Sequence, residues 1–404
     1  MATQLQLCYG KVPLYLRFGG IFGLLSLAAV GPGRWATFGR AVVLLVLLRR
    51  WWKCFFRWPS RVLVWKERPL EPSVEGLHKR FVELYLPDAE KGEGGEYAVL
   101  GAQKKLQISG QTLAFWDVGP RDAKDAVLVC NGLGARVMTW APLLTALRKT
   151  SASWAQRRLV IFDYRGQFDS VPLQGEISVE RSAKDAAELA DHLKLKRCIL
   201  LCWSTGVQIG LQLALDRPDL VAAMVLIQGT TGEAMKALLQ PLCQVPGVPS
   251  LLDFGLQMAP RLLKSHRQMM HGALVRHRSA FERLGSCLLW FFGSDLIAAA
   301  GVRYTQDMLQ SDEHFVNYCR YALALGRHKI FSRLPDIKAP AFVVTGTPDF
   351  ITPARCSYDM AVQLGGPTNL LDDLGGSHYY IYEEPQKLAQ EMAQFLERCA
   401  PVKA

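Results

Sequence analysis

Residues 200–210 combine residue types suited to nucleophilic chemistry. An apolar run stops at Ser204, small residues follow the serine, and a helical pattern of apolar residues then begins. This order predicts a strand, a sharp turn and a helix, with the serine hydroxyl exposed at the carboxyl edge of a sheet. The usual pattern is G-x-S-x-G, and here it becomes Cys202-x-Ser204-x-Gly206. Ser204 is therefore a candidate nucleophile, although an ordinary strand-to-helix turn would give the same pattern.

A serine hydroxyl needs a base near neutral pH, and His378 is the candidate among eight histidines. It lies in a Gly-rich segment, LGGSHYYIYEEP, between the last expected strand and the last expected helix. Asp349, in the segment TGTPDFITP just past the preceding strand, is the candidate for the carboxylate that orients the base. Asp372 and Asp373 are alternatives, but their place at the end of a strand is more typical of turn caps.

A Gly-bearing turn, Asn131-Gly132-Leu133-Gly134, follows the first strand of the expected parallel sheet. Such a turn lets a backbone amide face a ligand. The amides of Leu133 and Thr205 would then stabilise negative charge that develops on a substrate oxygen. Phosphate binding is the alternative, but Gly-x-Gly without a third glycine or a downstream acid is a poor dinucleotide fingerprint. We expect neither a cofactor nor a metal.

These residues need a parallel sheet to hold them at one edge. Two strand-like runs at 103–108 and 111–118 form an expected hairpin. Strand-like and helix-like segments then alternate at 126–130, 137–147, 158–162, 178–193, 198–202, 205–215 and 222–227. The alternation resumes at 341–345, 354–364, 369–371 and 385–399. This pattern predicts an α/β fold with a doubly wound, mostly parallel sheet, helices on both faces and ligands at the carboxyl ends of the strands.

Between the two alternating parts, residues 230–335 contain mainly helix-like segments. They are predicted at 235–242, 251–264, 280–292 and 314–324. A helical block inserted late into such a sheet is expected to form a cap over the strand ends. Its apolar run 288–292 and its many Arg and His residues allow two interpretations. One is an acyl-binding lid beside a basic rim for anionic head groups, and the other is a helix with a buried apolar face and a solvated basic face.

Together, these motifs resemble those of the α/β-hydrolase superfamily, in a form with a helical cap, over about residues 97–400. Four segments carry the resemblance: residues 131–134, the Ser204 turn, Gly346-x-x-Asp349-x-x-x-Pro353, and residues 375–378 with Glu384-Pro385. The chain order of serine, aspartate and histidine is also that of the family.

The resemblance implies a role for each candidate residue. Ser204 would be the nucleophile, His378 the general base and acid, and Asp349 the residue that orients the imidazole. The amides of Leu133 and Thr205 would form the oxyanion hole. A serine at the nucleophile position argues against the dehalogenase and epoxide-hydrolase branches, which use an aspartate there. Esterase, lipase, thioesterase and amidase activities remain open.

The sequence departs from the family pattern at three positions. Asn131 stands where a histidine is frequent, and Cys202 replaces the first glycine of the serine turn. In the segment DYRGQFDS, Phe168 stands where a glycine is common. Arg165 of the same segment is expected to tie loops together.

Positive charge is concentrated at the N-terminus. Residues 1–66 hold ten of the 47 Lys and Arg residues and no acid, which leaves 37 basic against 36 acidic residues in the remainder. A nearly neutral body disfavours a nucleic-acid-binding protein, which would need a basic face on the folded domain. The ten cysteines form no CxxC pair, and several fall in apolar runs, as expected for buried thiols in a reducing compartment.

Two apolar runs in the N-terminal region, 12–30 and 41–48, are followed by a Trp, Phe, Arg and Lys cluster at 49–58. They predict one membrane span or a re-entrant helical pair, with the following domain on the cytoplasmic side. An organellar transit peptide and a cleaved secretory signal are the alternatives. The expected organisation is an anchor at 1–66, a linker at 67–96, a hydrolase core at 97–229 and 336–404, and a cap at 230–335.

The combined hypothesis is a membrane-associated serine hydrolase. It would cleave an ester or thioester of a lipid or acyl substrate through an acyl intermediate on Ser204. A non-catalytic hydrolase-fold binding or scaffold protein is the alternative from another class. An acyltransferase that uses the same three residues is a further alternative.

Overall fold

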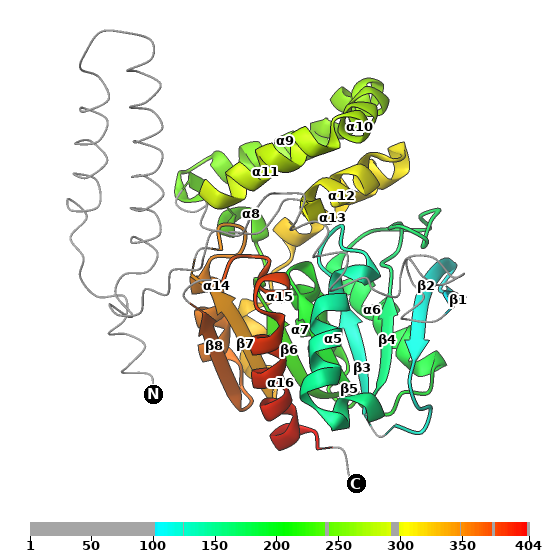
Figure 1. Cartoon of the computed structure of the whole chain (residues 1–404), viewed down its shortest axis with the longest axis vertical. Helices are drawn as coiled ribbons and strands as arrows, with labels where there is room; N and C mark the ends of the chain where they lie inside the picture. The colour runs from blue at the N-terminus through cyan, green and yellow to red at the C-terminus, as the bar shows by residue number, and fades with distance from the viewer. Residues whose placement is uncertain are drawn as a thin grey trace, which may run out of the picture.

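The computed structural model describes residues 102–401, apart from residues 124, 239–241, 292–298, 348 and 374–375. The predicted N-terminal anchor and linker lie outside the described residues. Within the described part, a central sheet lies between two layers of helices, and further helices lie above one end of the sheet (Figure 1).

The sheet has eight strands in the order β1-β2-β4-β3-β5-β6-β7-β8. Their bounds are β1 Lys104–Ile108, β2 Gln111–Val118, β3 Ala126–Cys130, β4 Arg158–Phe162, β5 Cys198–Trp203, β6 Val221–Ile227, β7 Ala341–Gly346 and β8 Thr368–Asp373. The pairs β1–β2 and β2–β4 are antiparallel, and the other neighbours are parallel. The chain passes from β3 to β4 on one side and then to β5 on the other side of β3. The crevice at this reversal is where open α/β sheets bind ligands.

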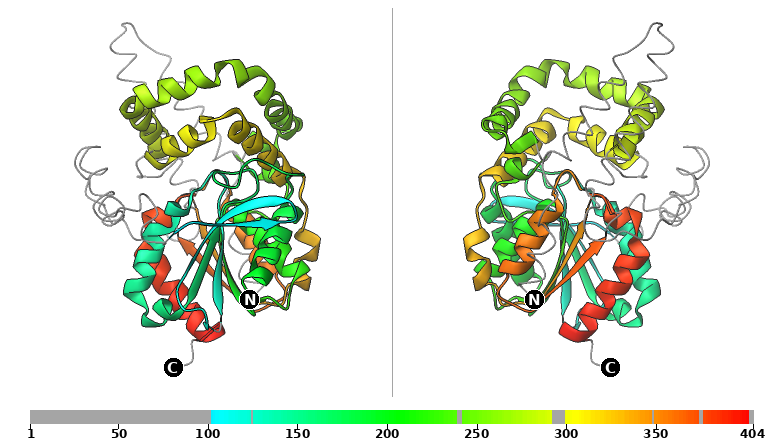
Figure 2. Two further views of the ribbon diagram at one scale, coloured as in Figure 1. Left: turned by 90° about the vertical axis from the view of Figure 1, so that its right-hand side faces the viewer. Right: turned by 90° about the vertical axis from the view of Figure 1, so that its left-hand side faces the viewer.

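Helices cover both faces of the sheet (Figure 2). Helices α5 (Ala141–Thr150) and α16 (Pro385–Cys399) lie on one face. Helices α6 (Val179–His192), α7 (Thr205–Asp216) and α14 (Ala354–Gln363) lie on the other. Successive residues of a strand point to opposite faces. Leu200 and Leu201 of β5 accordingly belong to separate apolar cores on the two faces. This two-sided burial explains why the central strands are continuous apolar runs in the sequence.

The cap is inserted between β6 and β7, above the carboxyl ends of the strands (Figure 1). Its helices are α8 Ala234–Ala237, α9 Val248–Leu263, α10 Arg267–Arg276, α11 Arg278–Phe291, α12 Ala299–Leu309 and α13 Asp312–Arg327. The chain enters and leaves the cap side by side, because Gly232 forms an antiparallel bridge with Lys329. The sequence did not predict α10 or α12. Only Arg267 and Leu274 are buried in α10, so it offers no apolar period.

The prediction of a membrane location is wrong and is corrected here. Among the helices that the structure describes, none combines the length and the apolar character needed to cross a bilayer. The two apolar runs on which the prediction rested fall within residues 1–66, outside the described residues. The placement of the domain on the cytoplasmic side of a membrane is withdrawn with it.

Candidate active site

Ser204 occupies the sharp turn between β5 and α7. Its backbone has φ 55° and ψ −114°, a conformation that residues with a side chain rarely adopt. Two backbone hydrogen bonds hold the turn: Ser204 N donates to Ile227 O at 2.9 Å, and Val207 N donates to Ser204 O at 3.0 Å. The strand, turn and helix predicted from the sequence are therefore present, and they place Ser204 at the carboxyl edge of the sheet.

Two glycines allow α7 to pack closely against the sheet behind this turn. A Cβ at Gly206 would overlap the carbonyl oxygen of Cys130, and a Cβ at Gly210 would overlap the thiol of Cys202. The Cys202 thiol thus occupies space that the absent side chain of Gly210 leaves. The cysteine that replaces the first glycine of the usual pattern is therefore compatible with close packing of strand and helix.

The structure brings Ser204, His378 and Asp349 together from three separate loops. The Nε2 atom of His378 lies 3.0 Å from Ser204 Oγ, and its Nδ1 atom lies 2.9 Å from Asp349 Oδ2. The side chains of His378 and Asp349 are 5% and 0% exposed. A neutral imidazole in this position donates its Nδ1 proton to the carboxylate and accepts the serine proton at Nε2. The three predicted residues thus form a continuous chain of contacts from hydroxyl to imidazole to carboxylate.

The carboxylate of Asp349 is fixed by its own loop. Its Oδ1 accepts hydrogen bonds of 2.8 Å from the backbone amides of Ile351 and Thr352. The Thr352 hydroxyl lies 2.7 Å from Asp349 Oδ2, 3.1 Å from His378 Nδ1 and 2.9 Å from Gln228 O. Thr352 was not among the site residues predicted from the sequence. The available signal was a hydroxyl residue three positions after the aspartate, a spacing at which local side-chain hydrogen bonds are common.

The His378 loop is held by two residues that the sequence analysis also missed. Gln228 follows β6, is fully buried and has φ 48°. Its Oε1 accepts from Tyr380 N at 3.4 Å, and its Nε2 donates to Ser377 O. Trp203 Nε1 donates to His378 O at 3.1 Å. These bonds fix the backbone on both sides of the imidazole.

The two predicted oxyanion amides belong to loops after neighbouring strands. Thr205 is the first residue of α7, where backbone amides have no partner within the helix. Leu133 lies in the turn after β3. The preceding Gly132 packs against the indole of Trp203, since a Cβ at Gly132 would lie 2.7 Å from Trp203 Cε3. The turn that carries Leu133 is therefore held beside the residue that precedes Ser204.

Asn131, which stands where the family often has a histidine, has a structural position. It is 2% exposed. Its Oδ1 accepts from Trp140 Nε1 at 2.6 Å, and its Nδ2 donates to Phe162 O at 2.9 Å. The Tyr164 hydroxyl donates to its carbonyl at 2.9 Å. These bonds tie the turn after β3 to the end of β4.

The alternative aspartates bond to other side chains. Asp372 Oδ2 accepts from the Tyr358 hydroxyl, and Asp373 Oδ2 accepts from Tyr380 Oη at 2.8 Å and from Lys387 Nζ at 2.6 Å. Asp349 is thus the carboxylate beside His378. In the part of the chain that the structure describes, no three His, Cys, Asp or Glu side chains are grouped so as to hold a metal ion.

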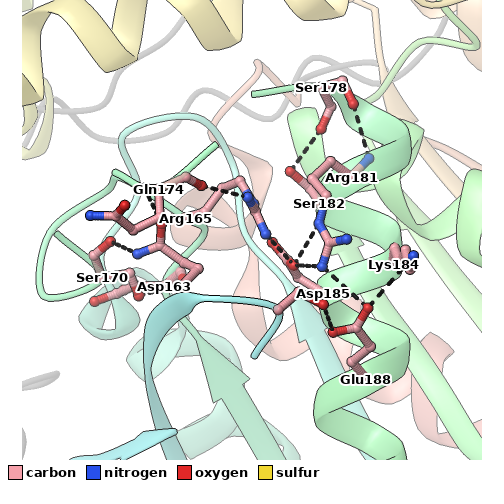
Figure 3. Close-up of polar contacts among 12 residues, drawn as sticks. Asp163, Arg165, Ser170, Gln174, Ser178, Arg181, Ser182, Lys184, Asp185 and Glu188 are labelled. Carbon is pink, nitrogen blue, oxygen red and sulfur yellow. Dashed lines mark hydrogen bonds and ion pairs between the residues drawn. The ribbon is translucent and has the colours of Figure 1, made fainter. Parts of the chain in front are cut away.

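Arg165 ties loops together, as expected from the sequence (Figure 3). Its Nε and Nη2 atoms each donate to the Asp185 carboxylate at 2.6 Å, and its Nη1 donates to Gln174 O at 2.9 Å. Arg181 also donates to Asp185 at 2.6 Å. This buried network joins the loop after β4 to helix α6.

Comparison with known proteins is consistent with this architecture. A family model described as alpha/beta hydrolase fold matches residues 125–385. A protein of Stutzerimonas stutzeri, provisionally named carbamate hydrolase RutD, is 27% identical over 288 residues, which are 70% of this chain and 96% of that protein. Two solved structures share the fold. A hydrolase from Pseudomonas aeruginosa is 22% identical with a TM-score of 0.52, over 73% of this chain and 98% of its own. The enol-lactonase from Burkholderia xenovorans is 20% identical with a TM-score of 0.51, over 72% of this chain and 99% of its own.

Proposed function

Since this chain belongs to the alpha/beta hydrolase fold family, we propose that it is a serine hydrolase acting on carboxylic esters or thioesters. The intermediate is an acyl group on Ser204. The main support is the arrangement of one imidazole between two partners, 3.0 Å from Ser204 Oγ and 2.9 Å from Asp349 Oδ2. A hydroxyl linked in this way to a base, and through it to a carboxylate, is the arrangement that activates a serine.

The first half of the reaction transfers the acyl group to the enzyme. Ser204 Oγ attacks the substrate carbonyl carbon while His378 Nε2 takes the hydroxyl proton. The electron pair of the carbonyl moves to its oxygen, which the amides of Leu133 and Thr205 stabilise. His378 then gives the proton to the leaving oxygen or sulfur. The bond to the leaving group breaks, and the acyl group stays on Ser204.

The second half releases the acid. A water molecule attacks the acyl carbon while His378 takes one of its protons, and the same proton returns to Ser204 Oγ as the acid leaves. One water is consumed for each ester cleaved. Asp349 keeps the Nε2 atom directed at Ser204 and stabilises the imidazolium that forms in each half. Thr352 and Gln228 hold this pair in position.

The substrate is proposed as a small acyl ester or thioester. The sequence suggested a lipid substrate on two grounds, the predicted membrane anchor and the apolar run 288–292. The membrane location proved wrong. The side chains of that run are outside the described residues. Substrates for an activity test should include esters, thioesters and a carbamate. The carbamate is included because a relative that matches 70% of this chain is named for carbamate hydrolysis.

The test uses a fluorescent phosphonate that reacts with activated serines. The full chain should be labelled, and Ser204→Ala should lose the label together with at least about 10³-fold of the ester and thioester turnover. Ser265→Ala, at an exposed cap serine, is the matched control and should be labelled like the wild type. Equal labelling of wild type and Ser204→Ala would refute the assignment. A folded wild type that does not react would favour a binding protein.

A further inference from the structure

Phe168 has a backbone conformation that a bulky residue rarely adopts. It lies in the loop after β4 with φ 44°, in the left-handed region that favours glycine. This conformation costs free energy and persists where the surrounding structure demands it. The contacts of the ring therefore indicate what the strained residue does.

The ring of Phe168 lies between core and cap. It is 8% exposed, and the guanidinium carbon of Arg136 lies 4.7 Å from its centroid, within the range of a cation–π contact. Arg136 Nε also donates to Asp307 Oδ2, on cap helix α12, at 2.8 Å. On the cap side, the His314 ring centroid lies 6.5 Å from that of Phe168, and His314 Nε2 lies 3.3 Å from Phe168 O. Arg136 of the core and His314 of the cap thus contact Phe168, and Asp307 of the cap holds Arg136.

This ring fills space beside the oxyanion turn. The cavity that remains there is about 10 Å³, which is room for about one water molecule. It is lined from the core by Gly134, Gly166 and Phe168, and from the cap by Asp307, Met308 and Tyr318. Gly134 follows Leu133 directly, and a Cβ at Gly134 would lie 3.1 Å from Tyr318 Cε2. Core and cap are thus closed tightly next to Leu133, and the Phe168 ring is part of that closure.

We propose that Phe168 is a specificity-determining residue of the Ser204 site. Its ring limits the size of the substrate group that extends from Ser204 past Leu133 into the space between core and cap, and Arg136 holds the ring there. The inference rests on the proposed function. It adds a size limit on the substrate and assigns that limit to one side chain.

The experiment compares the full-length wild type with Phe168→Gly, which removes the ring and suits the left-handed backbone. Two substrate series are used: nitrophenyl esters with acyl chains of increasing length, and acetates of alcohols of increasing size. In at least one series, kcat/KM for the largest substrate relative to the smallest should rise about tenfold or more, mainly through KM. Phe168→Leu, which keeps an apolar side chain, should give a smaller rise and carries the test if the glycine variant does not fold.

The matched control is Phe254→Ala, which removes a phenylalanine that is 60% exposed on α9. Its ratio of large to small substrate should equal that of the wild type. An unchanged ratio in both series, in a Phe168 variant that still reacts fully with the phosphonate, would overturn the size limit alone. Absence of phosphonate labelling in the wild type would instead contradict the proposed function, and the size limit with it.

Discussion

Asp163 is a buried aspartate whose protonation differs between the folded and the unfolded chain. It follows β4 directly and is 2% exposed. Burial raises its pKa to about 8, and a hydrogen bond from the Asp169 amide opposes that shift only in part. An aspartate in the unfolded chain has a pKa of 3.8. Folded Asp163 therefore keeps its proton at neutral pH, whereas the unfolded chain loses it.

This difference predicts a pH-dependent stability. Between about pH 4 and pH 8, the folded state binds one proton more than the unfolded state at Asp163, so its contribution to the free energy of unfolding falls as pH rises. The slope is at most about 1.4 kcal/mol per pH unit. Asp163→Asn removes this slope, so its stability relative to the wild type should rise up to about pH 8 and then level off. Urea denaturation at a series of pH values measures the free energy of unfolding of both proteins. Asp122→Asn, at an exposed aspartate, is the control. If the two proteins differed in free energy of unfolding by the same amount at every pH, the raised pKa of Asp163 would be contradicted.

The residues that the sequence revealed and those it missed differ in how they are positioned. Ser204 directly follows a strand, and Asp349 and His378 lie in loops after strands, so the alternating pattern alone brings all three to one edge of the sheet. Thr352 and Gln228 act through contacts made after the loops fold. The Gln228 amide, for example, reaches Ser377 O, 149 residues away. A single sequence carries no signal for such a contact.

The secondary-structure elements whose bounds were predicted best from the sequence are buried ones. The bounds of β3, β4 and α16 agree with those expected from the sequence, because burial makes their apolar pattern distinct. Helix α9 begins three residues earlier than expected, at Val248. Pro249 lies in its first turn, where a proline costs no internal hydrogen bond. Patterns of apolar residues therefore identify elements better than they identify ends.

The packing of α7 on β5 gives a prediction at this scale. Gly210→Ala should destabilise the fold by about 1–3 kcal/mol, because its Cβ would overlap the Cys202 thiol. In a Cys202→Ala background the overlap disappears, and the same substitution should become neutral or stabilising by up to about 1 kcal/mol, since alanine favours helix. Urea denaturation of the four proteins in this cycle measures the coupling.

Gly272→Ala is the matched control for that cycle. Gly272 lies in α10, and no atom lies within 4 Å of a Cβ placed there. It should therefore show the helix preference alone, in both backgrounds. Additive effects of Gly210→Ala and Cys202→Ala would show that the thiol does not occupy the space left by the glycine.

For the molecule as a whole, the loop after β4 links its three parts. On one side, Arg165 pairs with Asp185 of α6 (Figure 3). On the cap side, Asn317 Nδ2 of α13 donates to Gly166 O at 2.9 Å, and Tyr321 Oη donates to Arg165 O at 3.2 Å. The sheet, one helical layer and the cap thus share one loop. The sequence predicted the fold around this loop. The predicted membrane location was wrong; it rested on the apolar runs and the aromatic and basic cluster within residues 1–66.

Breaking this link should destabilise the whole protein. Arg165 and Asp185 are 2% and 1% exposed, so Arg165→Met leaves a buried carboxylate with Arg181 as its remaining arginine partner. We expect the free energy of unfolding to fall by about 3 kcal/mol, because one arginine remains where two faced the buried carboxylate. Arg165→Met combined with Asp185→Leu should recover part of that loss, because the buried carboxylate is then absent and Arg181 keeps Glu188 as a partner. Urea denaturation measures all three proteins.

The control for Arg165→Met is Arg355→Met. It removes an arginine that is 71% exposed and pairs with Asp359 on the surface of α14. Solvent screens that pair, so the loss should be below about 1 kcal/mol. Similar losses for the two arginines, or a double variant less stable than Arg165→Met alone, would mean that the buried pair is not what joins the loop to α6. A large loss of unfolding free energy in Arg165→Met alone would instead show that the Arg165–Asp185 pair stabilises the loop after β4. The same loop carries Phe168, which lies between core and cap.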